Sequence, residues 1–489
     1  MAVSPVELQH YISGAWEEGD GGFLASVNPA RPAETVAHGR AAGVGDLDRA
    51  MASATAAKRA WARTPAHERG AVLLRAAAIL TANSAAWGLE LAREEGKTVA
   101  EGEGEVLRAA QIFSYYGHDA DRQAGEVYSS PRRGEKILVT RKPLGVVGIV
   151  TPFNFPIAIP AWKIAPALTY GNTVVWKPAS AVPLLAMRLA QALDQAGLPD
   201  GVLHLLIGPG AIGTALVEHP GLDGLSFTGS TGVGRTLAAA AAGRGVPMQA
   251  EMGGKNAAIV LADADLDLAL DQVMLGAFRS TGQKCTATSR LIVAESAADE
   301  FLLRLRTRAE ELAVGDPTEA GVQMGPVVNA GARSSIQRGI DTSLAQGGSL
   351  LAGGVPYTDS SLADGYFVPP TLVELPHGSS ADIWREELFG PVLAVRRAPS
   401  TQAAFDLAND SEFGLSAALF TQDVTRALDG MDELDVGILH VNSESAGADP
   451  HVPFGGAKKS GYGPKEQGQS AREFYTHTTT VYLRGGQGA

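Results

Sequence analysis

Short apolar runs alternate with helical stretches along most of this chain, and this alternation limits the possible folds more than any other feature. Four β-branched or apolar runs, each followed by an Ala- and Leu-rich segment, span residues 137–153, 172–178, 201–208 and 224–230. Runs separated by helices pair as parallel strands, because a parallel neighbour needs a long crossover. Four further runs follow at residues 289–295, 366–374, 390–398 and 414–421. We therefore predict an α/β fold with two parallel-sheet units.

The N-terminal part of the chain has a different texture. In its first forty residues, short apolar runs are broken by turn clusters such as GDGG and NPARP, which predict hairpins and loops. From Asp46 to Arg63 and from His67 to Glu95, apolar residues recur three and four positions apart. This spacing predicts two long amphipathic helices.

Length and charge restrict the organisation and the partners. A chain of 489 residues exceeds what one hydrophobic core organises, so two or three packed units are expected. The formal charge of −13 would repel phosphate groups, which disfavours nucleic acids and anionic membranes as partners. The sequence lacks an apolar run of about twenty residues, and its start lacks the pattern of a secretion signal. We expect a cytoplasmic protein with small-molecule partners.

Cys285 is the only cysteine, so the chain can form neither an internal disulfide nor a multi-thiolate metal site, and we predict no metal. A lone cysteine is most often an inert buried residue. Cys285, however, stands beside Lys284 in a segment of small residues. A thiolate near Lys284 or near a cationic cofactor ring would have a lowered pKa, which favours a nucleophilic role. Glu251 precedes two glycines, so its carboxylate either points into a cleft or lies on the surface.

Glycine clusters follow two of the predicted strands. The spacing of the dinucleotide fingerprint occurs at Gly208, Gly210 and Gly213. A plain strand-to-helix turn is the alternative there. The turn at residues 229–234 could present backbone N–H groups to a phosphate, with capping of the next helix by Ser230 or Thr231 as the alternative.

At this point seven ordered motifs resemble those of the aldehyde dehydrogenase family, over nearly the whole chain. They are PFNFP at 152–156, KPAS at 177–180, FTGSTGVG at 227–234, EMGGK at 251–255, FRSTGQKC at 278–285, EELFGPV at 386–392 and PFGGAKKSG at 453–461. The resemblance implies an α/β fold with a Rossmann-like cofactor domain, an α/β catalytic domain and a small β oligomerisation element.

The resemblance also implies a mechanism. The Cys285 thiolate attacks the aldehyde carbon, and the side-chain amide of Asn154 and the N–H of Cys285 hold the resulting oxyanion. Hydride then passes to a nicotinamide ring and leaves a thioester. Glu251 activates the water that hydrolyses this thioester. Relatives that transfer the acyl group to coenzyme A tend to lack this glutamate, so its presence favours hydrolysis.

The expected cofactor is NADP or NAD. By resemblance, Lys177 contacts the adenine-side ribose, Gly229, Ser230 and Gly234 contact the pyrophosphate, and Glu387 and Phe389 contact the nicotinamide riboside. The same resemblance adds Thr151, Pro152, Ser180, Gly213 and Phe227 to the cofactor site. Many NAD-dependent relatives have a glutamate where this chain has Ser180, which would repel a 2′-phosphate, so NADP use is expected to be possible. Phe153 and Pro464 also depart from the common motifs, without removing a catalytic group.

The resemblance divides the chain into three parts. Residues 1–122 and 142–250 form the cofactor domain, residues 251–453 the catalytic domain, and residues 123–141 and 470–489 the oligomerisation element. In that element a hairpin and a terminal strand would extend a sheet across a subunit interface, which predicts a homodimer or homotetramer.

The motifs around Cys285 and near the C-terminus look most like those of bacterial α-ketoglutaric semialdehyde dehydrogenases. Aromatic aldehydes and succinic semialdehyde are the alternatives. A substrate carboxylate could bind Lys163, Arg279 or Arg290, although structural ion pairs are the more frequent role of such residues.

Other classes of function stay open on the sequence alone. A thiol hydrolase or esterase would pair Cys285 with a histidine, and none lies within thirty residues of it. His451 is a histidine that folding could bring near. An acylating enzyme that uses coenzyme A and a scaffold without activity are further alternatives, and the presence of both Cys285 and Glu251 argues against them.

Overall fold

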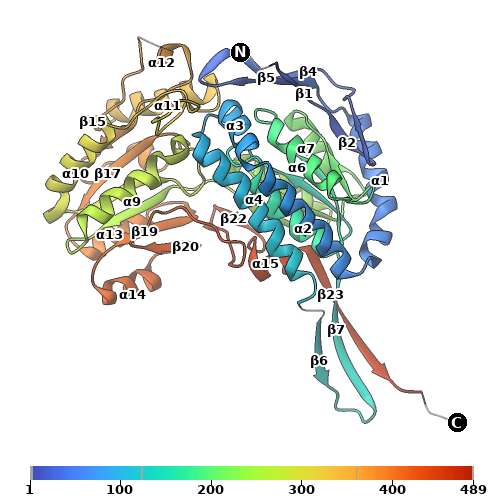
Figure 1. Ribbon diagram of the computed structural model, residues 1–489. Helices are drawn as coiled ribbons and strands as arrows, with labels where there is room; N and C mark the ends of the chain where they lie inside the picture. The colour runs from blue at the N-terminus through green and yellow to red at the C-terminus, as the bar shows by residue number, and fades with distance from the viewer. Residues whose placement is uncertain (1–3, 123–124, 359–360, 487–489) are drawn as a thin grey trace.

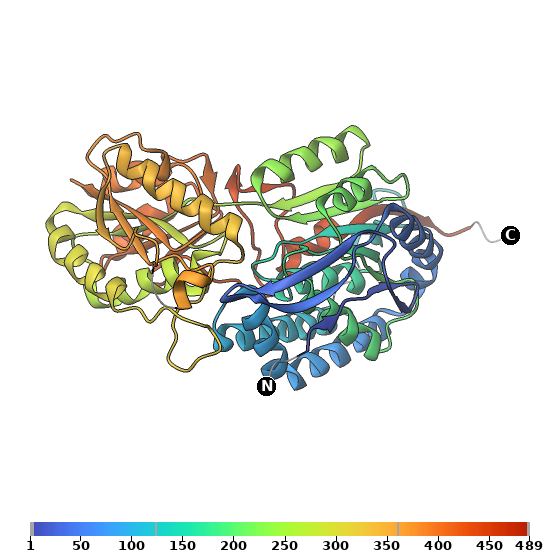
Figure 2. The same cartoon turned by 90° about the horizontal axis from the view of Figure 1, so that it is seen from above.

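The computed structural model describes residues 4–122, 125–358 and 361–486, and it has two lobes, each built around a largely parallel sheet (Figures 1 and 2). The α/β fold predicted from the alternation is therefore confirmed. Among the described residues no single helix is long and apolar enough to span a membrane. The helices α2 (Ala66–Ala82) and α3 (Ser84–Glu95) together reach the length and composition of a span, but the chain bends by 71° between them.

The first lobe contains an eight-stranded sheet in the order β22-β12-β11-β8-β9-β10-β2-β3. Five parallel strands form its centre: β8 (Val146–Val150), β9 (Thr173–Lys177), β10 (Leu203–Leu205), β11 (Gly224–Thr228) and β12 (Met248–Glu251). Antiparallel strands complete its edges: β2 (His10–Ile12), β3 (Ala15–Glu17) and β22 (Gly461–Tyr462).

Helices cover both faces of this sheet because successive side chains in a strand point to opposite sides. In β9, Val174 and Trp176 join one core while Val175 joins the other. The helices on the first face are α2, α3, α4 (Val99–Asp119), α5 (Ala158–Thr169) and α6 (Leu184–Gln195). Those on the second face are α1 (Val44–Arg63), α7 (Gly210–Glu218) and α8 (Thr231–Gly243).

The helix predicted from His67 to Glu95 is two helices, α2 and α3. Asn83 separates them, because its side-chain amide donates to the carbonyl of Ile79 and its own N–H bonds the last turn of α2. Such local bonds compete with helix continuation. The apolar spacing continues across Asn83, which is why the pattern alone did not predict the break.

The second lobe contains a seven-stranded sheet in the order β15-β16-β17-β14-β13-β19-β20. Its strands are β13 (Asn256–Val260), β14 (Thr288–Ala294), β15 (Ser349–Ala352), β16 (Thr371–Glu374), β17 (Val392–Ala398), β19 (Ser416–Phe420) and β20 (Ile438–Val441), and only β15 is antiparallel. Helices α9 (Leu266–Phe278) and α10 (Glu295–Glu310) pack on one face. Helices α11 (Ala330–Ala345) and α13 (Thr401–Asn409) pack on the other, next to α14 (Val424–Glu433).

A three-stranded antiparallel sheet projects from the body (Figure 1). It pairs β23 (Thr476–Arg484) with β7 (Glu135–Pro143) and β7 with β6 (Gly125–Ser129). The run at 137–153, predicted to belong to the parallel sheet, is thus divided between β7 and β8. Gly145, with φ +134°, lies between the two strands, where the chain leaves one sheet for the other. Residues 123–124 and 487–489 of the predicted oligomerisation element lie outside the described residues.

Smaller elements complete the fold. The hairpins predicted near the N-terminus are present as β2–β3 and as β4–β5. The remaining elements are β1 (Val6–Glu7), β4 (Phe23–Asn28), β5 (Arg31–Arg40), β18 (Phe413–Gly414), β21 (Ala457–Lys458), α12 (Ser361–Asp364), α15 (Gly468–Tyr475) and the 3₁₀ turns η1 (Arg279–Gly282) and η2 (Asp382–Trp384).

The order of the first sheet reverses between β8 and β11. From β8 the chain moves outward to β9 and β10, then returns to the other side of β8 to form β11 and β12. Loops at the carboxyl ends of strands separate at such a switch point and leave a crevice there. The structure therefore places its main ligand-binding edge between β8 and β11.

Candidate active site

Four loops at the carboxyl edge of the first sheet bring the predicted residues together. Thr151, Pro152 and Asn154 follow β8, Lys177 ends β9, and Glu251 ends β12. The predicted pyrophosphate residues follow β11, on the other side of the switch point. Residues from separate predicted motifs thus lie at the same carboxyl edge of the eight-stranded sheet.

The N-terminus of α8 opens onto this edge. Ser230 is the N-cap residue of α8, but its side chain makes no capping hydrogen bond. Capping of the helix by the Ser230 hydroxyl, the alternative to phosphate binding, is therefore not observed. A Cβ on Gly229 would lie 2.6 Å from the Phe227 ring, and one on Gly234 would lie 2.6 Å from Met252 Sδ. The glycines therefore let α8 pack tightly against β11 and β12. Its first N–H groups remain available for an anion, as at other helix N-termini.

Lys177 is a buried cation on the same edge, with 6% of its surface exposed. Among the described residues, its ammonium has no hydrogen-bond or ion-pair partner. Burial lowers the pKa of Lys177 to about 8. Gly213, inside α7, would bring a Cβ within 3.9 Å of the Lys177 side chain, so this helix packs beside the lysine. Ser180 lies half-buried three residues further along the chain.

Cys285 reaches the edge from the second lobe through a strained turn. Ser280 and Thr281 both have φ +54°, and Gly282 has φ +67°. Left-handed conformations in non-glycine residues cost roughly 1–3 kcal/mol each and gather at functional sites. A Cβ on Gly282 would lie 2.3 Å from the carbonyl oxygen of Gly390, so only glycine fits there.

The thiol of Cys285 is protonated at rest. Burial raises its pKa to about 12, and the carboxylates of Glu387 and Glu251 add to the effect. The prediction that Lys284 lowers this pKa is wrong, because its ammonium turns away to the carbonyl of Leu275 at 3.2 Å and to Glu444 at 3.3 Å. The backbone N–H groups of Thr286 and Cys285 act in the opposite direction and lower this pKa.

Asn154 is held against the segment that carries Cys285. Its side-chain amide donates to the carbonyl oxygen of Gln283 at 2.8 Å, which leaves one N–H for another acceptor. Lys97 donates to the carbonyl oxygen of Asn154 at 2.8 Å and to Glu105 at 2.7 Å. Glu105 also accepts the N–H groups of the residues that begin α5. This buried pair therefore fixes the loop from Asn154 to the start of α5.

Glu251 lies in a buried pocket of the first lobe. Its carboxylate accepts the N–H of Gly456 at 3.0 Å. Burial raises the pKa of Glu251 well above its usual value, and the nearby carboxylate of Glu466 raises it further. Lys163 and Lys465 are the cations that act in the opposite direction.

Lys163 and Arg290 have the structural roles that the sequence analysis favoured over binding of a substrate carboxylate. Lys163 is fully buried, pairs with Glu466 and donates to Ser226 at 3.0 Å. Arg290 is also buried and donates to the carbonyl oxygens of Lys255, Leu407 and Ala408. Both side chains are committed to the fold. Arg279 is half exposed and lies at a cavity, so it remains a candidate.

Glu387 and Phe389 also reach the site. Glu387 accepts the N–H of Gly254 at 3.1 Å, and burial raises its pKa to about 7. Phe389 has φ +53°, and its ring packs edge-on against that of Phe153, with the ring centroids 5.8 Å apart. The charge of Glu387 raises the pKa of the Cys285 thiol, so the two groups lie near one another.

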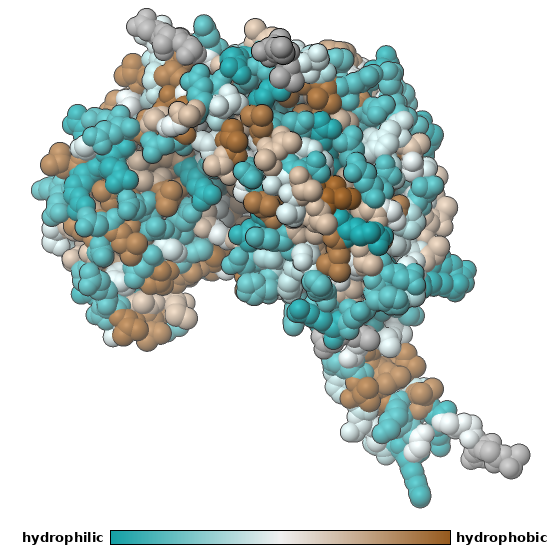
Figure 3. All heavy atoms as spheres, in the orientation of Figure 1, coloured by the Kyte–Doolittle hydropathy of each residue, from teal (hydrophilic) through white to brown (hydrophobic). Residues whose placement is uncertain are grey.

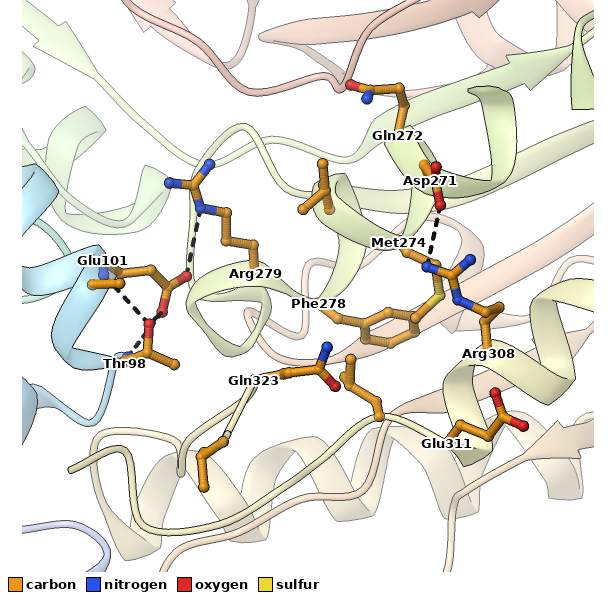
Figure 4. Close-up of a pocket in the computed structure, with 14 residues that line it drawn as sticks. Thr98, Glu101, Asp271, Gln272, Met274, Phe278, Arg279, Arg308, Glu311 and Gln323 are labelled. Atoms are coloured by element: carbon orange, nitrogen blue, oxygen red, sulfur yellow. Dashed lines mark hydrogen bonds and ion pairs between the residues drawn. The ribbon is translucent and has the colours of Figure 1, made fainter. Parts of the chain in front are cut away.

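A cavity of about 400 Å³ opens in front of Cys285. It is lined by Lys97, Glu101, Gly104, Glu105, Arg108, Phe155, Ala158, Ile159, Trp162, Arg279, Ser280, Lys284, Cys285, Thr286, Glu444, Ala446, Gly447, Ala448 and Phe454. No histidine is among these described residues. A second hollow of about 810 Å³ adjoins it and shares Glu101 and Arg279, which face one another in Figure 4.

The sequence reasoning missed several of these lining residues. Glu101, Gly104, Glu105 and Arg108 stand at helical spacing in the sequence, which was the available signal that they share one face of a helix. Among the described residues, no group of three or more His, Cys, Asp or Glu side chains is arranged to hold a metal ion.

A parallel sheet whose strand order reverses, with an open helix N-terminus and an unpaired buried lysine at its carboxyl edge, is typical of enzymes of the nucleotide-cofactor class. The chain belongs to the aldehyde dehydrogenase family, whose model matches residues 16–481. It is thus an NAD(P)-dependent oxidoreductase that acts on aldehydes, and the resemblance drawn from the motifs is confirmed.

Individual relatives match over almost their full length. The α-ketoglutaric semialdehyde dehydrogenase of Bacillus subtilis is 40% identical over 477 residues, which cover 97% of this chain and 98% of the relative. The 2,5-dioxopentanoate dehydrogenase of Saccharolobus solfataricus is 37% identical, with 96% and 98% covered. The crystal structure of betaine aldehyde dehydrogenase from Staphylococcus aureus with NAD⁺ is 31% identical, has a TM-score of 0.94, and covers 97% of this chain and 95% of its own.

The structural role of Lys163 gives a test of stability. Lys163→Met leaves Glu466 buried without its cation, so the free energy of unfolding should fall by about 3–5 kcal/mol. Urea denaturation measures this loss. The matched control is Arg304→Met, which removes a surface ion pair with Asp267 and should leave the denaturation midpoint nearly unchanged. A Lys163→Met midpoint equal to that of the control would contradict the assigned role.

Proposed function

We propose that this enzyme oxidises α-ketoglutaric semialdehyde, also named 2,5-dioxopentanoate, to its dicarboxylic acid, with Cys285 as nucleophile and Glu251 as base. The observation that carries the chemistry is the placement of Cys285 at the cavity, next to the Asn154 amide and within reach of the Glu251 and Glu387 charges. The names of the relatives from Bacillus subtilis and Saccharolobus solfataricus support the choice of substrate.

In the proposed reaction the Cys285 sulfur adds to the aldehyde carbon. The remaining N–H of the Asn154 amide and the backbone N–H of Cys285 stabilise the oxyanion that forms. When bound, the nicotinamide cofactor supplies the hydride acceptor and a positive charge near the thiol. Glu251 then takes a proton from the water that cleaves the thioester, and burial, which raises its pKa, makes this carboxylate a stronger base than an exposed one.

The residues present fit a nicotinamide dinucleotide. The uncapped start of α8 offers N–H groups to the pyrophosphate, and the unpaired ammonium of Lys177 offers a donor to the adenine-side ribose. Thr151, Pro152, Gly213 and Phe227 form the surrounding walls, and Glu387 and Phe389 lie on the nicotinamide side. Ser180 supports the use of NADP as well as NAD, because no carboxylate stands at that position to repel a 2′-phosphate. These assignments, together with the domain limits given above, are part of the proposal.

The absorbance of the reduced cofactor tests this function directly. Purified enzyme is assayed with 2,5-dioxopentanoate, succinic semialdehyde and benzaldehyde, each with NAD and with NADP, in the absence of coenzyme A. We expect the highest kcat/KM with 2,5-dioxopentanoate and no signal from Cys285→Ala. A preference for benzaldehyde or succinic semialdehyde would reject the substrate. Product formation that requires coenzyme A would reject the hydrolytic mechanism.

Lys177 makes the choice of cofactor depend on pH. Its pKa of about 8 lies well below the usual lysine value, so the ammonium loses its proton as the pH rises through this region. An NADP 2′-phosphate near this group would lose a charge-assisted bond, whereas NAD would lose a weaker one. We therefore expect KM for NADP to rise more steeply than KM for NAD above about pH 8. Steady-state kinetics on both sides of this pH measure the two slopes, and parallel slopes would contradict the placement.

Assembly into homodimers or homotetramers belongs to the same proposal. The projecting sheet β6–β7–β23 carries four exposed large side chains, Val127, Tyr128, Tyr482 and Leu483, and Figure 3 shows apolar atoms gathered on it. Its outer strands leave backbone groups unpaired, which favours contact with a second subunit.

The formal charge of the chain, −13, supports small molecules rather than nucleic acids as ligands. A cytoplasmic location, where nicotinamide cofactors are abundant, completes the proposal.

A further inference from the structure

One face of α4 forms a wall of the cavity in front of Cys285. Glu101, Gly104, Glu105 and Arg108 line the cavity from positions separated by three, one and three residues, which places them on one side of the helix. A Cβ on Gly104 would meet no atom within 4 Å. Glycine inside a helix costs about 1 kcal/mol relative to alanine. Gly104 therefore leaves open space one turn before Arg108.

Each cation around this cavity already has a carboxylate partner. Lys97 pairs with Glu105 and Lys284 with Glu444, and both lysines are buried. Arg279 lies between Glu101 and Glu444, at 3.6 Å from each, and Figure 4 shows it directed at Glu101. Arg108 pairs with Asp449 at 3.1 Å. An anionic substrate that binds one of these cations must therefore share it with a carboxylate or replace that carboxylate.

The Arg108–Asp449 pair is exposed enough for the substrate to replace one partner. Its side chains are 39% and 60% exposed, and ion pairs of this kind contribute only about 0–1 kcal/mol. Asp449 lies after β20 in a stretch without helix or strand. The partner of Arg279 is held more firmly, because Glu101 also accepts the N–H of Ser280 at 2.7 Å and the N–H of Thr98 at 2.9 Å.

We propose that Arg108 binds the carboxylate of the substrate, with Asp449 holding the guanidinium in position until the substrate replaces it. The site would take aldehydes that carry a carboxylate several carbons away from the aldehyde group. The planar guanidinium can bind both carboxylate oxygens, so it fixes the far end of the molecule while Cys285 meets the aldehyde carbon. This inference rests on the proposed function, because it assumes a substrate with a negative charge.

The test compares a charged and an uncharged aldehyde of equal carbon number, 2,5-dioxopentanoate and pentanal. The measured quantity is the ratio of their kcat/KM values. Arg108→Gln should lower this ratio roughly 10- to 100-fold, the effect of losing one charge-assisted hydrogen bond. The loss should lie mainly in KM, because the bond forms on binding. Arg108→Lys should retain part of the ratio.

Two further variants separate the alternatives. Asp449→Asn should raise the ratio, because it removes the carboxylate that competes with the substrate. Arg304→Gln, on the outer face of α10, is the matched control and should keep the ratio of the unmodified enzyme. A ratio that falls in Arg279→Gln and not in Arg108→Gln would overturn the proposal, as would an equal loss with both aldehydes in Arg108→Gln.

Failure of the proposed function would look different. It would be visible in the unmodified enzyme, as a ratio that does not favour the charged aldehyde, and the inference about Arg108 would then fall with it. Failure of the inference alone would leave that preference intact in the unmodified enzyme and in Arg108→Gln.

Discussion

Burial of ionisable groups between the two lobes is the constraint on which the site depends. Cys285, Glu251 and Glu387 all have raised pKa values, and burial is the largest cause for each. Charge on any of them is costly in the low dielectric of the site. Burial therefore opposes the thiolate form of Cys285, and in the proposed mechanism the positive charge of a bound cofactor would offset this effect.

The buried lysines differ in what they pair with. Lys97 is matched by Glu105, and this pair holds the loop that carries Asn154. Lys163 is matched by Glu466, which offsets part of the burial that lowers the pKa of Lys163. Lys177 has no such partner among the described residues, and burial is the cause that lowers its pKa. A ligand with a negative charge or a hydrogen-bond acceptor would complement this ammonium.

Much of this arrangement could be predicted from the sequence. The alternation of strands and helices identified the fold, and the motifs brought Cys285, Glu251 and Asn154 into one hypothesis before their positions were known. Side-chain directions could not be predicted in the same way. Lys284 adjoins Cys285 in sequence, yet three successive left-handed residues turn the chain beforehand and its ammonium ends at Glu444. The split of residues 137–153 between two sheets likewise depends on a distant partner, β23, that no local pattern reveals.

In the proposed mechanism an acyl group passes through Cys285 and is released by a water that Glu251 activates. Rapid quenching of Glu251→Gln with aldehyde and cofactor, followed by peptide mass spectrometry and by absorbance of the reduced cofactor, tests both steps together. We expect an acyl adduct on the peptide that contains Cys285, formed in step with one equivalent of reduced cofactor and then persisting. Rapid steady turnover in this variant, or an adduct on another residue, would contradict the proposed mechanism.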